Sequence, residues 1–369
     1  MKKITVNLGK RSYQIIIGYK IINLLSGYLK KLNLTESSVV ITNARIKKII
    51  GIKLINVLKS ANISYRFKTV PDSEKSKSQA IAFKLIDRIS YFTKLKTPFI
   101  IALGGGVVGD LAGFIASVYK RGIPYIQIPT TLLAQVDSSI GGKVGIDLAY
   151  GKNLVGSFYQ PRLVLSDIAL LNTLPKKQVI SGLAEVIKYG LIKDKVLFEY
   201  IEKNYQRISG LERPSLEYII NKCALIKADI VTQDEKETKG VRTILNFGHT
   251  IAHAIEAAGN FKAYNHGQAV GLGMLAAAEI SLDLGLLSSK ETISRIKDLL
   301  FRVGLPVNLK GLSIERIIKA LAFDKKFIRG KNRFVLLKNI GQAVIRENIP
   351  VLVIRRALKR LNRDTSYLN

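Results

Sequence analysis

The sequence predicts an α/β dinucleotide-binding domain with a mostly parallel sheet, followed by a mainly α-helical domain. Up to about residue 175, short runs rich in β-branched residues alternate with helical patterns, as in βαβ units. Beyond that point, apolar residues recur at helical spacing over long segments. The chain has 369 residues, enough for two domains of roughly 100 to 200 residues each. We therefore expect the domains to span residues 1–175 and 176–369.

The elements follow in order along the chain. Two alternating runs at 4–8 and 13–17, around Gly9, predict a hairpin. Short apolar runs bounded by turn residues or helical patterns predict four strands, at 38–42, 98–103, 125–128 and 163–166. Five helices are expected in the second half, at 178–192, 215–231, 249–258, 267–284 and 290–303. A late hairpin is expected from 333–337 and 343–346.

Composition excludes several classes of protein. Hydrophobic residues make up 47% and charged residues 23%, as in an ordinary globular protein. The longest apolar runs are interrupted well before the roughly 18 residues of a membrane span. Residues 1–10 resemble a charged strand rather than a targeting peptide, and the single Cys223 fits a reducing compartment. We therefore expect a cytoplasmic protein without a membrane partner.

The net charge is +31, from 58 Lys and Arg against 27 Asp and Glu. A basic surface can serve a nucleic-acid partner, because cations neutralise phosphates. Alternatively, the lysines lie on solvated faces. They are scattered through every segment, and the densest basic runs are short and lack interleaved aromatic residues. The pattern favours solvated lysines and no nucleic-acid partner, and it is compatible with an anionic small-molecule substrate.

The segment at 104–110, Gly-Gly-Gly-Val-Val-Gly-Asp, follows a predicted strand and precedes a helical pattern. Glycines at such a turn let backbone N–H groups approach a pyrophosphate. Positions 104, 106 and 109 match the dinucleotide fingerprint, but no acidic residue follows about 20 residues later to bind a ribose. The segment therefore indicates nucleotide binding outside the standard Rossmann arrangement, or only a tight turn.

All three histidines of the chain, His249, His253 and His266, fall within one short stretch. His249 and His253 are four residues apart and would share one helix face, as in a metal-binding pair. Glu185 lies in an otherwise apolar helical run, where a carboxylate is costly unless it is paired or metal-bound. Lys188 is a candidate ion-pair partner for it. Alternatively, Glu185 and two histidines would complete a catalytic metal site with an open position.

A polar stretch at 129–143 continues to Gly151, Lys152 and Asn153. It combines hydroxyl residues, paired glycines, one acid and lysines. Such groups suit the binding of phosphate and hydroxyls, although alone the stretch would be interpreted as a polar loop.

Together, these stretches resemble the 3-dehydroquinate synthase family of the shikimate pathway. The resemblance covers nearly the whole chain. It is carried by the glycine turn at 104–110 and by residues 135–143, 183–190 and 245–250, which stand in the family's order.

The resemblance implies a carbon–oxygen lyase that converts 3-deoxy-D-arabino-heptulosonate 7-phosphate (DAHP) into 3-dehydroquinate and phosphate. The implied steps are transient oxidation by NAD, phosphate elimination, reduction, ring opening and an intramolecular aldol closure. The implied cofactors are NAD and one divalent metal ion, zinc or cobalt. Family members are commonly homodimers, and we expect the same here.

The resemblance also assigns site residues. NAD would lie between the two domains and contact Asn43, Asp72, Ser73, Glu74, Lys75, Ser76, Lys77, Gly105, Gly106, Val107, Val108, Gly109, Asp110, Thr130, Thr131, Lys143, Lys152, Leu170, Leu171, Asn172 and Thr173. The implied metal ligands are Glu185, His249 and His266. The implied catalytic residues are the proton carrier His253 with Lys143, Lys188, Arg242 and Asn246. The substrate would also contact Arg121, Asp137, Asn153, Lys227 and Lys326.

One stretch departs from the family pattern. Family members have Glu, two residues, a hydrophobic residue and Arg, whereas residues 237–242 read Glu-Thr-Lys-Gly-Val-Arg, one residue longer. The role of Glu237 is therefore open. The alternative functions are a metal-dependent polyol dehydrogenase of the same architecture, a related sugar-phosphate cyclase, or a basic nucleic-acid-binding module. A polyol dehydrogenase would not need the cations Lys143, Lys188, Lys227 and Arg242 for phosphate.

Overall fold

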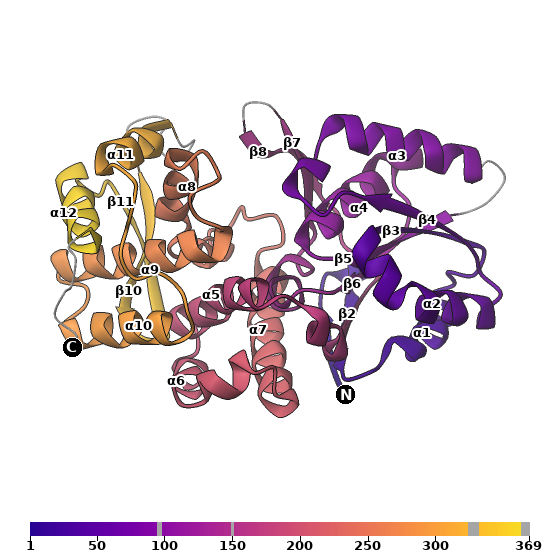
Figure 1. The fold of residues 1–369 in the computed structure, drawn as a ribbon, viewed down its shortest axis with the longest axis horizontal. Coiled ribbons are helices and arrows are strands. Elements are labelled where there is room, and N and C mark those ends of the chain that lie inside the picture. The colour runs from indigo at the N-terminus through magenta and orange to yellow at the C-terminus, as the bar shows by residue number, and fades with distance from the viewer. Residues whose placement is uncertain (94–97, 149–150, 324–331, 363–369) are drawn as a thin grey trace. The chain divides into compact units, whose positions relative to one another are not determined.

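The computed structural model describes residues 1–93, 98–148, 151–323 and 332–362 (Figure 1). It divides into two compact units. The first comprises residues 1–175 and 216–236, and the second comprises residues 176–215 and 237–369. Whether residues 1–175 bind the cofactor and residues 176–369 bind metal and substrate stays a prediction.

The first unit contains a seven-stranded sheet with the strand order β1-β2-β9-β6-β5-β3-β4. β1 and β2 form the predicted antiparallel hairpin, and the other neighbouring strands pair in parallel. The strands are β1 (Lys2–Val6), β2 (Tyr13–Gly18), β3 (Ser37–Asn43), β4 (Ser64–Val70), β5 (Pro98–Gly104), β6 (Tyr125–Pro129) and β9 (Leu163–Asp167).

Helices cover both faces of this sheet because alternate residues of each buried strand point to opposite sides. Val40 and Ile101 pack with helices α1 (Leu25–Lys31) and α2 (Ala44–Ser60). Their neighbours Val39 and Ile100 pack with α3 (Gln79–Phe92) and α4 (Gly106–Val118). The result is a three-layer sandwich.

The sheet has a topological switch point between β3 and β5. From β3 the chain continues through α2 to β4 on one side, whereas β5 continues through α4 to β6 on the other. α2 and α4 lie on opposite faces. In open α/β sheets, ligands bind at the carboxyl ends of the strands where the connections diverge in this way.

A small antiparallel sheet of β7 (Lys143–Leu148) and β8 (Gly151–Phe158) completes the first unit. Val144 and Ile146 of β7 join the core cluster of α3 and α4, whereas β8 is largely exposed. The long helix α7 (Arg213–Gln233) belongs to the first unit from Leu216 onward.

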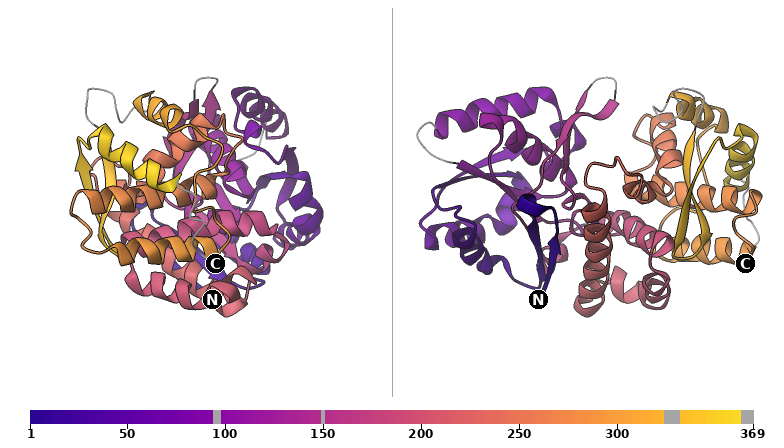
Figure 2. Two further views of the ribbon diagram at one scale, coloured as in Figure 1. Left: turned by 60° about the vertical axis from the view of Figure 1, so that its left-hand side comes forward. Right: turned by 180° about the vertical axis from the view of Figure 1, so that it is seen from behind.

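The second unit is built around α9 (His266–Asp283), which is almost entirely buried. Helices α5, α8, α10 and α12 and strand β10 pack against it, and Figure 2 shows this arrangement from two further sides. The remaining elements are α5 (Lys176–Ile192), α6 (Lys195–Ser209), α8 (His249–Ala258), α10 (Lys290–Arg302), α11 (Ile314–Phe323), α12 (Val351–Leu361), β10 (Arg333–Asn339) and β11 (Gln342–Glu347). β10 and β11 pair as the predicted late hairpin.

The predicted fold class is confirmed. In the part of the chain that the structure describes, no helix combines the length and apolar character needed to cross a membrane.

Candidate functional site

In the first unit, the predicted cofactor residues gather at one edge of the sheet. Because parallel strands end at the same edge, the segments that follow them lie together there. Asn43 is the last residue of β3, residues 72–77 follow β4, and residues 105–110 follow β5. Thr130 and Thr131 follow β6, and residues 170–173 follow β9. Five strands thus bring separate stretches of sequence to a single edge.

The glycine turn is a direct strand-to-helix junction at this edge. β5 ends at Gly104, Gly105 is the N-cap, and α4 begins at Gly106. The first N–H groups of a helix have no partner within it and can face an anion. A Cβ atom on Gly105 would lie 3.0 Å from Cγ2 of Thr131, and one on Gly106 would lie 3.1 Å from Oγ of Ser138. The turn therefore leaves little space for side chains.

Lys77 is a buried cation at the same edge, with a side chain only 4% exposed. Its Nζ lies 2.8 Å from Oδ2 of Asp110 and also donates a hydrogen bond to Oδ1 of Asn153. Burial alone would lower the pKa of Lys77, but Asp110 and Glu74 outweigh it and raise this pKa. Burial also raises the pKa of Asp110, against the opposing effect of Lys77. The pair thus joins the glycine turn to the β7–β8 hairpin.

Asp147 fixes the backbone of this hairpin. Its Oδ1 accepts a hydrogen bond of 2.8 Å from the N–H of Asn153, and its own N–H donates one of 2.6 Å to the carbonyl of Lys77. Asn153 has a left-handed φ of 54°. Asn tolerates this region better than most residues do. Lys77, Asp147 and Asn153 thus form a closed set of contacts.

A second buried lysine lies elsewhere in the first unit. Lys227 of α7 donates to Oδ1 of Asp137 at 2.8 Å and to the carbonyl of Asp137 at 2.6 Å. Asp137 lies in a π-helical turn, Ala134–Ser138, and such turns are frequent at functional sites. Both residues were predicted to contact substrate, and the structure places them in direct contact.

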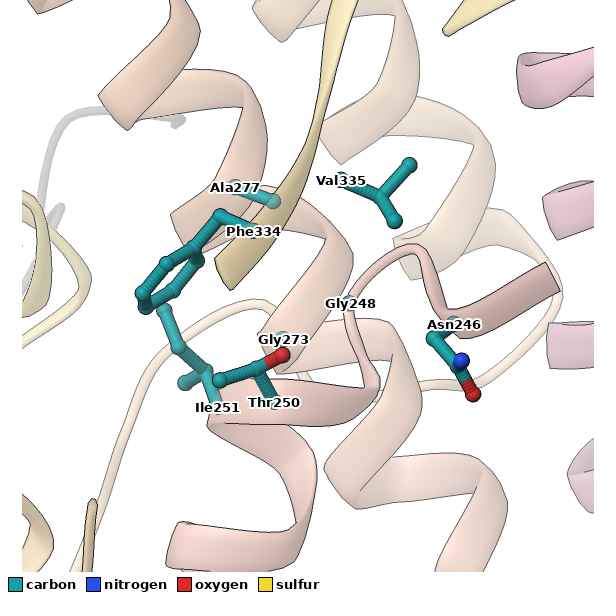
Figure 3. Close-up of a pocket in the computed structure, with 8 residues that line it drawn as sticks. All are labelled: Asn246, Gly248, Thr250, Ile251, Gly273, Ala277, Phe334 and Val335. Atoms are coloured by element: carbon teal, nitrogen blue, oxygen red, sulfur yellow. The ribbon is translucent and has the colours of Figure 1, made fainter. Parts of the chain in front are cut away.

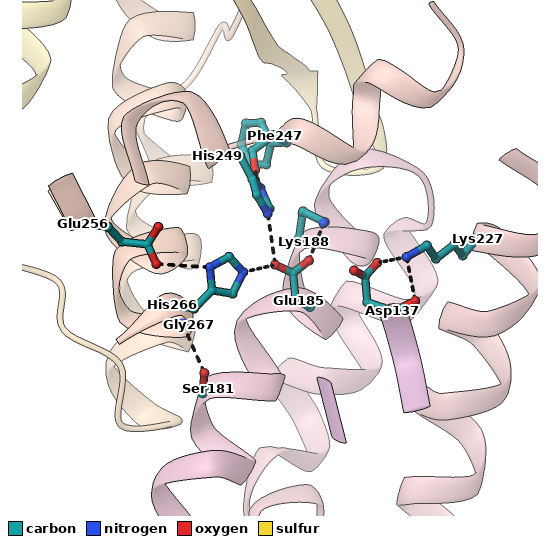
Figure 4. Close-up of polar contacts among 10 residues, drawn as sticks. All are labelled: Asp137, Ser181, Glu185, Lys188, Lys227, Phe247, His249, Glu256, His266 and Gly267. Atoms are coloured by element: carbon teal, nitrogen blue, oxygen red, sulfur yellow. Dashed lines mark hydrogen bonds and ion pairs between the residues drawn. The ribbon is translucent and has the colours of Figure 1, made fainter. Parts of the chain in front are cut away.

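In the second unit, three helices bring Glu185, His249 and His266 together (Figure 4). Their ligand atoms all lie within 4.8 Å of one another. Oε1 of Glu185 is 3.4 Å from Nε2 of His249 and 3.5 Å from Nε2 of His266. Lys188, one turn along α5, contacts Oε2 of Glu185. The carboxylate therefore has both the lysine neighbour and the histidine neighbours that the sequence suggested.

The Nδ1 atoms of both histidines face other acceptors. Nδ1 of His249 lies 3.1 Å from the carbonyl of Phe247. Nδ1 of His266 lies 3.4 Å from Oε1 of Glu256, a residue that is 7% exposed. When Nδ1 carries the proton, Nε2 keeps the lone pair that a metal needs. Both rings therefore present a potential ligand atom toward Glu185.

The two histidine helices pack with their backbones in contact. Gly248, just before His249, has a φ of 76°, and a Cβ atom on it would lie 2.8 Å from the N of Met274 in α9. A Cβ atom on Gly273 would lie 2.1 Å from the carbonyl oxygen of Gly248. Larger residues would separate α8 from α9. The close packing thus helps to bring His249 near His266.

The electrostatics follow from this packing. Burial raises the pKa of Glu185, but Lys188 and the two histidines outweigh it and hold this pKa well below its ordinary value. Burial and Lys188 lower the pKa of His249. Burial also opposes the charge on His266, but Glu185 and Glu256 raise its pKa to about 9. In the metal-free cluster at neutral pH, Glu185 is therefore ionised, His249 neutral and His266 protonated.

These residues fit a divalent metal ion. Glu185 is 1% exposed, yet within the described residues neither of its carboxylate oxygens accepts a hydrogen bond of normal geometry. Lys188 compensates the charge of this buried carboxylate on the Oε2 side, and Oε1 faces the two histidine nitrogens, where a metal ion would add a second cation. One carboxylate oxygen and two imidazole nitrogens are the donor set of a three-ligand catalytic site for zinc and also suit cobalt.

The other predicted residues have varied surroundings. His253 is exposed, and its ring meets that of His249 edge-on with centroids 5.6 Å apart. Arg242 is buried, and Asn246 donates a hydrogen bond of 3.1 Å to Oε1 of Glu237. The remaining predicted residues Arg121, Lys143 and Lys152 are exposed in the first unit, and Lys326 lies outside the described residues.

A narrow pocket lies beside the cluster's helices in the second unit (Figure 3). Its lining is mostly apolar and includes Gly248, Gly273 and Phe334, with Asn246 at one end. Glu185, His249 and His266 are not part of this lining. The pocket therefore marks a packing seam between α8, α9 and β10.

Sequence reasoning missed two residues of these networks. Glu256 follows His253 by three residues in the same helix, so an acid on the face of the histidine pair was an available signal. Asp147 carried no comparable signal, because its contacts depend on how β7 packs beside the loop after β4.

Comparison with known proteins agrees with this picture. The family model for the N-terminal part of 3-dehydroquinate synthase matches residues 67–181, and the model for its C-terminal part matches residues 182–327. The 3-dehydroquinate synthase of Desulforamulus reducens is 45% identical over 350 residues, covering 95% of this chain and 97% of the relative.

Solved structures extend the comparison. The 2-epi-5-epi-valiolone synthase of Streptomyces hygroscopicus, with NAD+ and Zn2+ bound, has a TM-score of 0.87 at 25% identity and covers 96% of this chain and 98% of its own. A 2-deoxy-scyllo-inosose synthase complexed with carbaglucose-6-phosphate, NAD+ and Co2+ also has a TM-score of 0.87 at 25% identity, with coverage of 97% and 100%. Taken with the matching family models, these findings place the chain in the 3-dehydroquinate synthase family.

Proposed function

We propose that this chain is a 3-dehydroquinate synthase, a lyase that converts DAHP into 3-dehydroquinate and phosphate. The observation that carries the proposal is the buried set of Glu185, His249 and His266, with both Nε2 atoms facing the carboxylate, in a chain of this family. The related solved enzymes contain NAD+ with Zn2+ or Co2+, which supports NAD and one divalent metal ion here.

In the second unit, Glu185, His249 and His266 would hold the metal ion. When bound, NAD supplies a reversible hydride acceptor and the metal ion a Lewis acid for substrate oxygen. Lys188 contacts Glu185 and keeps it ionised, as the lowered pKa of the carboxylate indicates. His253 carries an exposed imidazole beside His249, where it is able to exchange a proton with water or substrate. Arg242 and Asn246 supply donors for substrate oxygens.

In the first unit, the strand-end segments would bind NAD. The first N–H groups of α4 would bind the pyrophosphate, and Asn43 and residues 72–77 would supply polar groups for the ribose, a role that one acidic residue has in the standard fingerprint. Lys143 and Lys152 on the β7–β8 hairpin add positive charge for anionic groups. Asp137, Lys227, Asn153 and Arg121 would orient the hydroxyl, carboxylate and phosphate groups of the substrate.

The deciding experiment is turnover of DAHP with phosphate release as the readout. Substrate and product do not differ in oxidation state, so hydride removed from one carbon must return to it. Trace NAD should therefore support many turnovers without accumulation of NADH, and deuterium at the oxidised carbon should remain in the product. Stoichiometric NADH without phosphate release would instead favour a polyol dehydrogenase. Phosphate release only from another sugar phosphate would favour a related cyclase.

Several finer points belong to the same proposal. We expect a homodimer built largely on the first unit, a cytoplasmic location, and no nucleic-acid or membrane partner. The donor set does not discriminate zinc from cobalt. A duplex-DNA titration at physiological salt tests the charge argument, because binding through scattered lysines should be weak, non-selective and steeply salt-dependent.

A further inference from the structure

Glu256 is a buried carboxylate beside the metal cluster and is not one of its three ligand residues. It lies on α8, is 7% exposed, and its Oε1 is 3.4 Å from Nδ1 of His266. Figure 4 shows Glu256 and Glu185 on opposite sides of the His266 ring. Because Nδ1 and Nε2 are different atoms, Glu256 contacts this histidine without competing for the metal-facing nitrogen.

The backbone of His266 is held by other contacts. His266 is the first residue of α9, and Asn265 and Gln268 form a capping box around it. Gly267 donates a hydrogen bond of 3.2 Å to Oγ of Ser181 on α5, and a Cβ atom on Gly267 would lie 2.4 Å from the backbone of Ser181. Ser181 lies one turn before Glu185 on that helix. These contacts fix the Cα position of His266 relative to Glu185, but they do not fix the rotation of its ring.

We propose that Glu256 is a positioning residue for the metal site and acts through His266. It accepts the Nδ1–H of the ring, which holds Nε2 unprotonated and directed at Glu185 when metal is bound. A carboxylate that accepts the second ring N–H of a histidine ligand orients the ring and increases the basicity of the metal-facing nitrogen. His249 instead faces the neutral carbonyl of Phe247, so the effect of an added negative charge is confined to His266. The inference rests on the proposed metal site.

The test is the affinity of the purified chain for Co2+ and Zn2+, measured by visible absorption for Co2+ and by competition with a chelator for Zn2+. Glu256→Gln keeps an acceptor atom but removes the charge, so we expect about tenfold weaker binding once the affinities are corrected for proton competition at His266. Glu256→Leu removes both, and we expect about 100-fold weaker binding. Loss of second-sphere partners typically costs metal sites 10- to 100-fold in affinity, which sets this scale.

Glu279→Gln is the matched control. Glu279 lies on α9, the helix of His266, and its side chain is 16% exposed and pairs with Arg360 at 2.8 Å. Its loss should lower the thermal stability of the second unit and leave both metal affinities within twofold of wild type. A purely structural role of Glu256 would make the two Gln variants alike.

The outcomes are distinct. Weaker binding in Glu256→Gln, with a control that binds normally, supports the inference even if Glu256→Leu does not fold. Wild-type affinity in a folded Glu256→Gln protein overturns it, as does equal weakening in Glu279→Gln. If the wild-type chain itself binds neither ion, the proposed metal site fails, and the inference fails with it.

Discussion

Part of the predicted cofactor set of the first unit lies on exposed loops at the strand ends, whereas the three predicted metal ligands of the second unit project from three packed helices. At the strand ends, backbone N–H groups and short loops form the surface, and residues 72–75 are exposed. In the metal cluster, Glu185 and Lys188 are 1% and 2% exposed and have no water to replace a lost partner. Single substitutions at the exposed strand-end loops should therefore have graded effects, and those in the buried metal cluster severe effects.

The largest expected effect is loss of turnover when the metal cluster is broken. Glu185→Gln removes the negative charge that Lys188 and both histidines face, so metal binding and catalysis should fall together. Because Lewis-acid stabilisation is worth several kcal/mol, we expect turnover to drop by at least about 10³-fold. Metal analysis and phosphate release measure the two effects.

Chelation of the wild-type protein supplies the control for that substitution. It should abolish turnover, and added Zn2+ or Co2+ should restore it without any change of sequence. A folded Glu185→Gln protein with a full complement of metal would contradict the ligand assignment, and so would a His266→Ala protein that keeps its metal.

The second effect concerns Lys77, the buried cation of the first unit. Lys77→Met leaves Asp110 without its 2.8 Å partner. Breaking a buried ion pair costs about 3 to 5 kcal/mol, and we expect about 3 kcal/mol because Asp110 is 23% exposed. Calorimetric unfolding of the first unit measures the loss. Adding Asp110→Asn should recover part of it, and a loss below about 1 kcal/mol would show that water replaces the pair.

The third effect is the pH dependence of metal affinity. The pKa of metal-free His266 is raised to about 9, above its ordinary 6.5, so a metal ion must displace a proton there at neutral pH. His249 has a lowered pKa and Glu185 is ionised, so neither should release one. Affinity should rise about tenfold per pH unit from 7 to 9 and then level off.

Calorimetry in buffers of different ionisation enthalpy counts the released protons, and a value near zero at pH 7.5 would refute the protonated state of His266. His266 also affects the stability of the metal-free protein, and this stability changes with pH in the opposite direction to the metal affinity. Its raised pKa stabilises that fold fully below pH 6.5, and the contribution is lost as the pH rises through about 9. Metal-free protein should therefore become less stable over the range in which metal binds more tightly.

Local sequence predicted several strand ends well, because a strand and the turn that follows it consist of consecutive residues. Residues 98–110 show this, since an apolar run, three glycines and a helical pattern already define a strand, a turn and a helix. β4 was missed, because its residues 64–69 are partly exposed and their apolar pattern is weak. The exposed strand β8 was missed for a similar reason.

The metal cluster illustrates the limit of such reasoning. Composition and spacing singled out Glu185 and three histidines, but spacing alone pointed to His249 and His253 as the metal-binding pair. Choosing His266 over His253 required the family resemblance, because the choice depends on the close packing of α8 on α9 and of Gly267 on Ser181. The contact between Ser181 and Gly267 joins residues 86 positions apart, and no local pattern encodes it.

The smallest expected effect is that of a substitution at Asp147, because this residue lies at a partly exposed edge of the first unit. Asp147→Ala removes the acceptor for the N–H of Asn153, which has a left-handed φ of 54° and keeps the hydrogen bond of its side chain with Lys77. One hydrogen bond at a partly exposed site is worth about 0.5 to 1.5 kcal/mol, so the KM for DAHP should rise about two- to tenfold with kcat nearly unchanged. Asp147→Asn keeps an acceptor oxygen and should behave like wild type. If both variants lose kcat by 100-fold or more, this edge is as intolerant as the buried cluster, and the contrast between the two units is wrong.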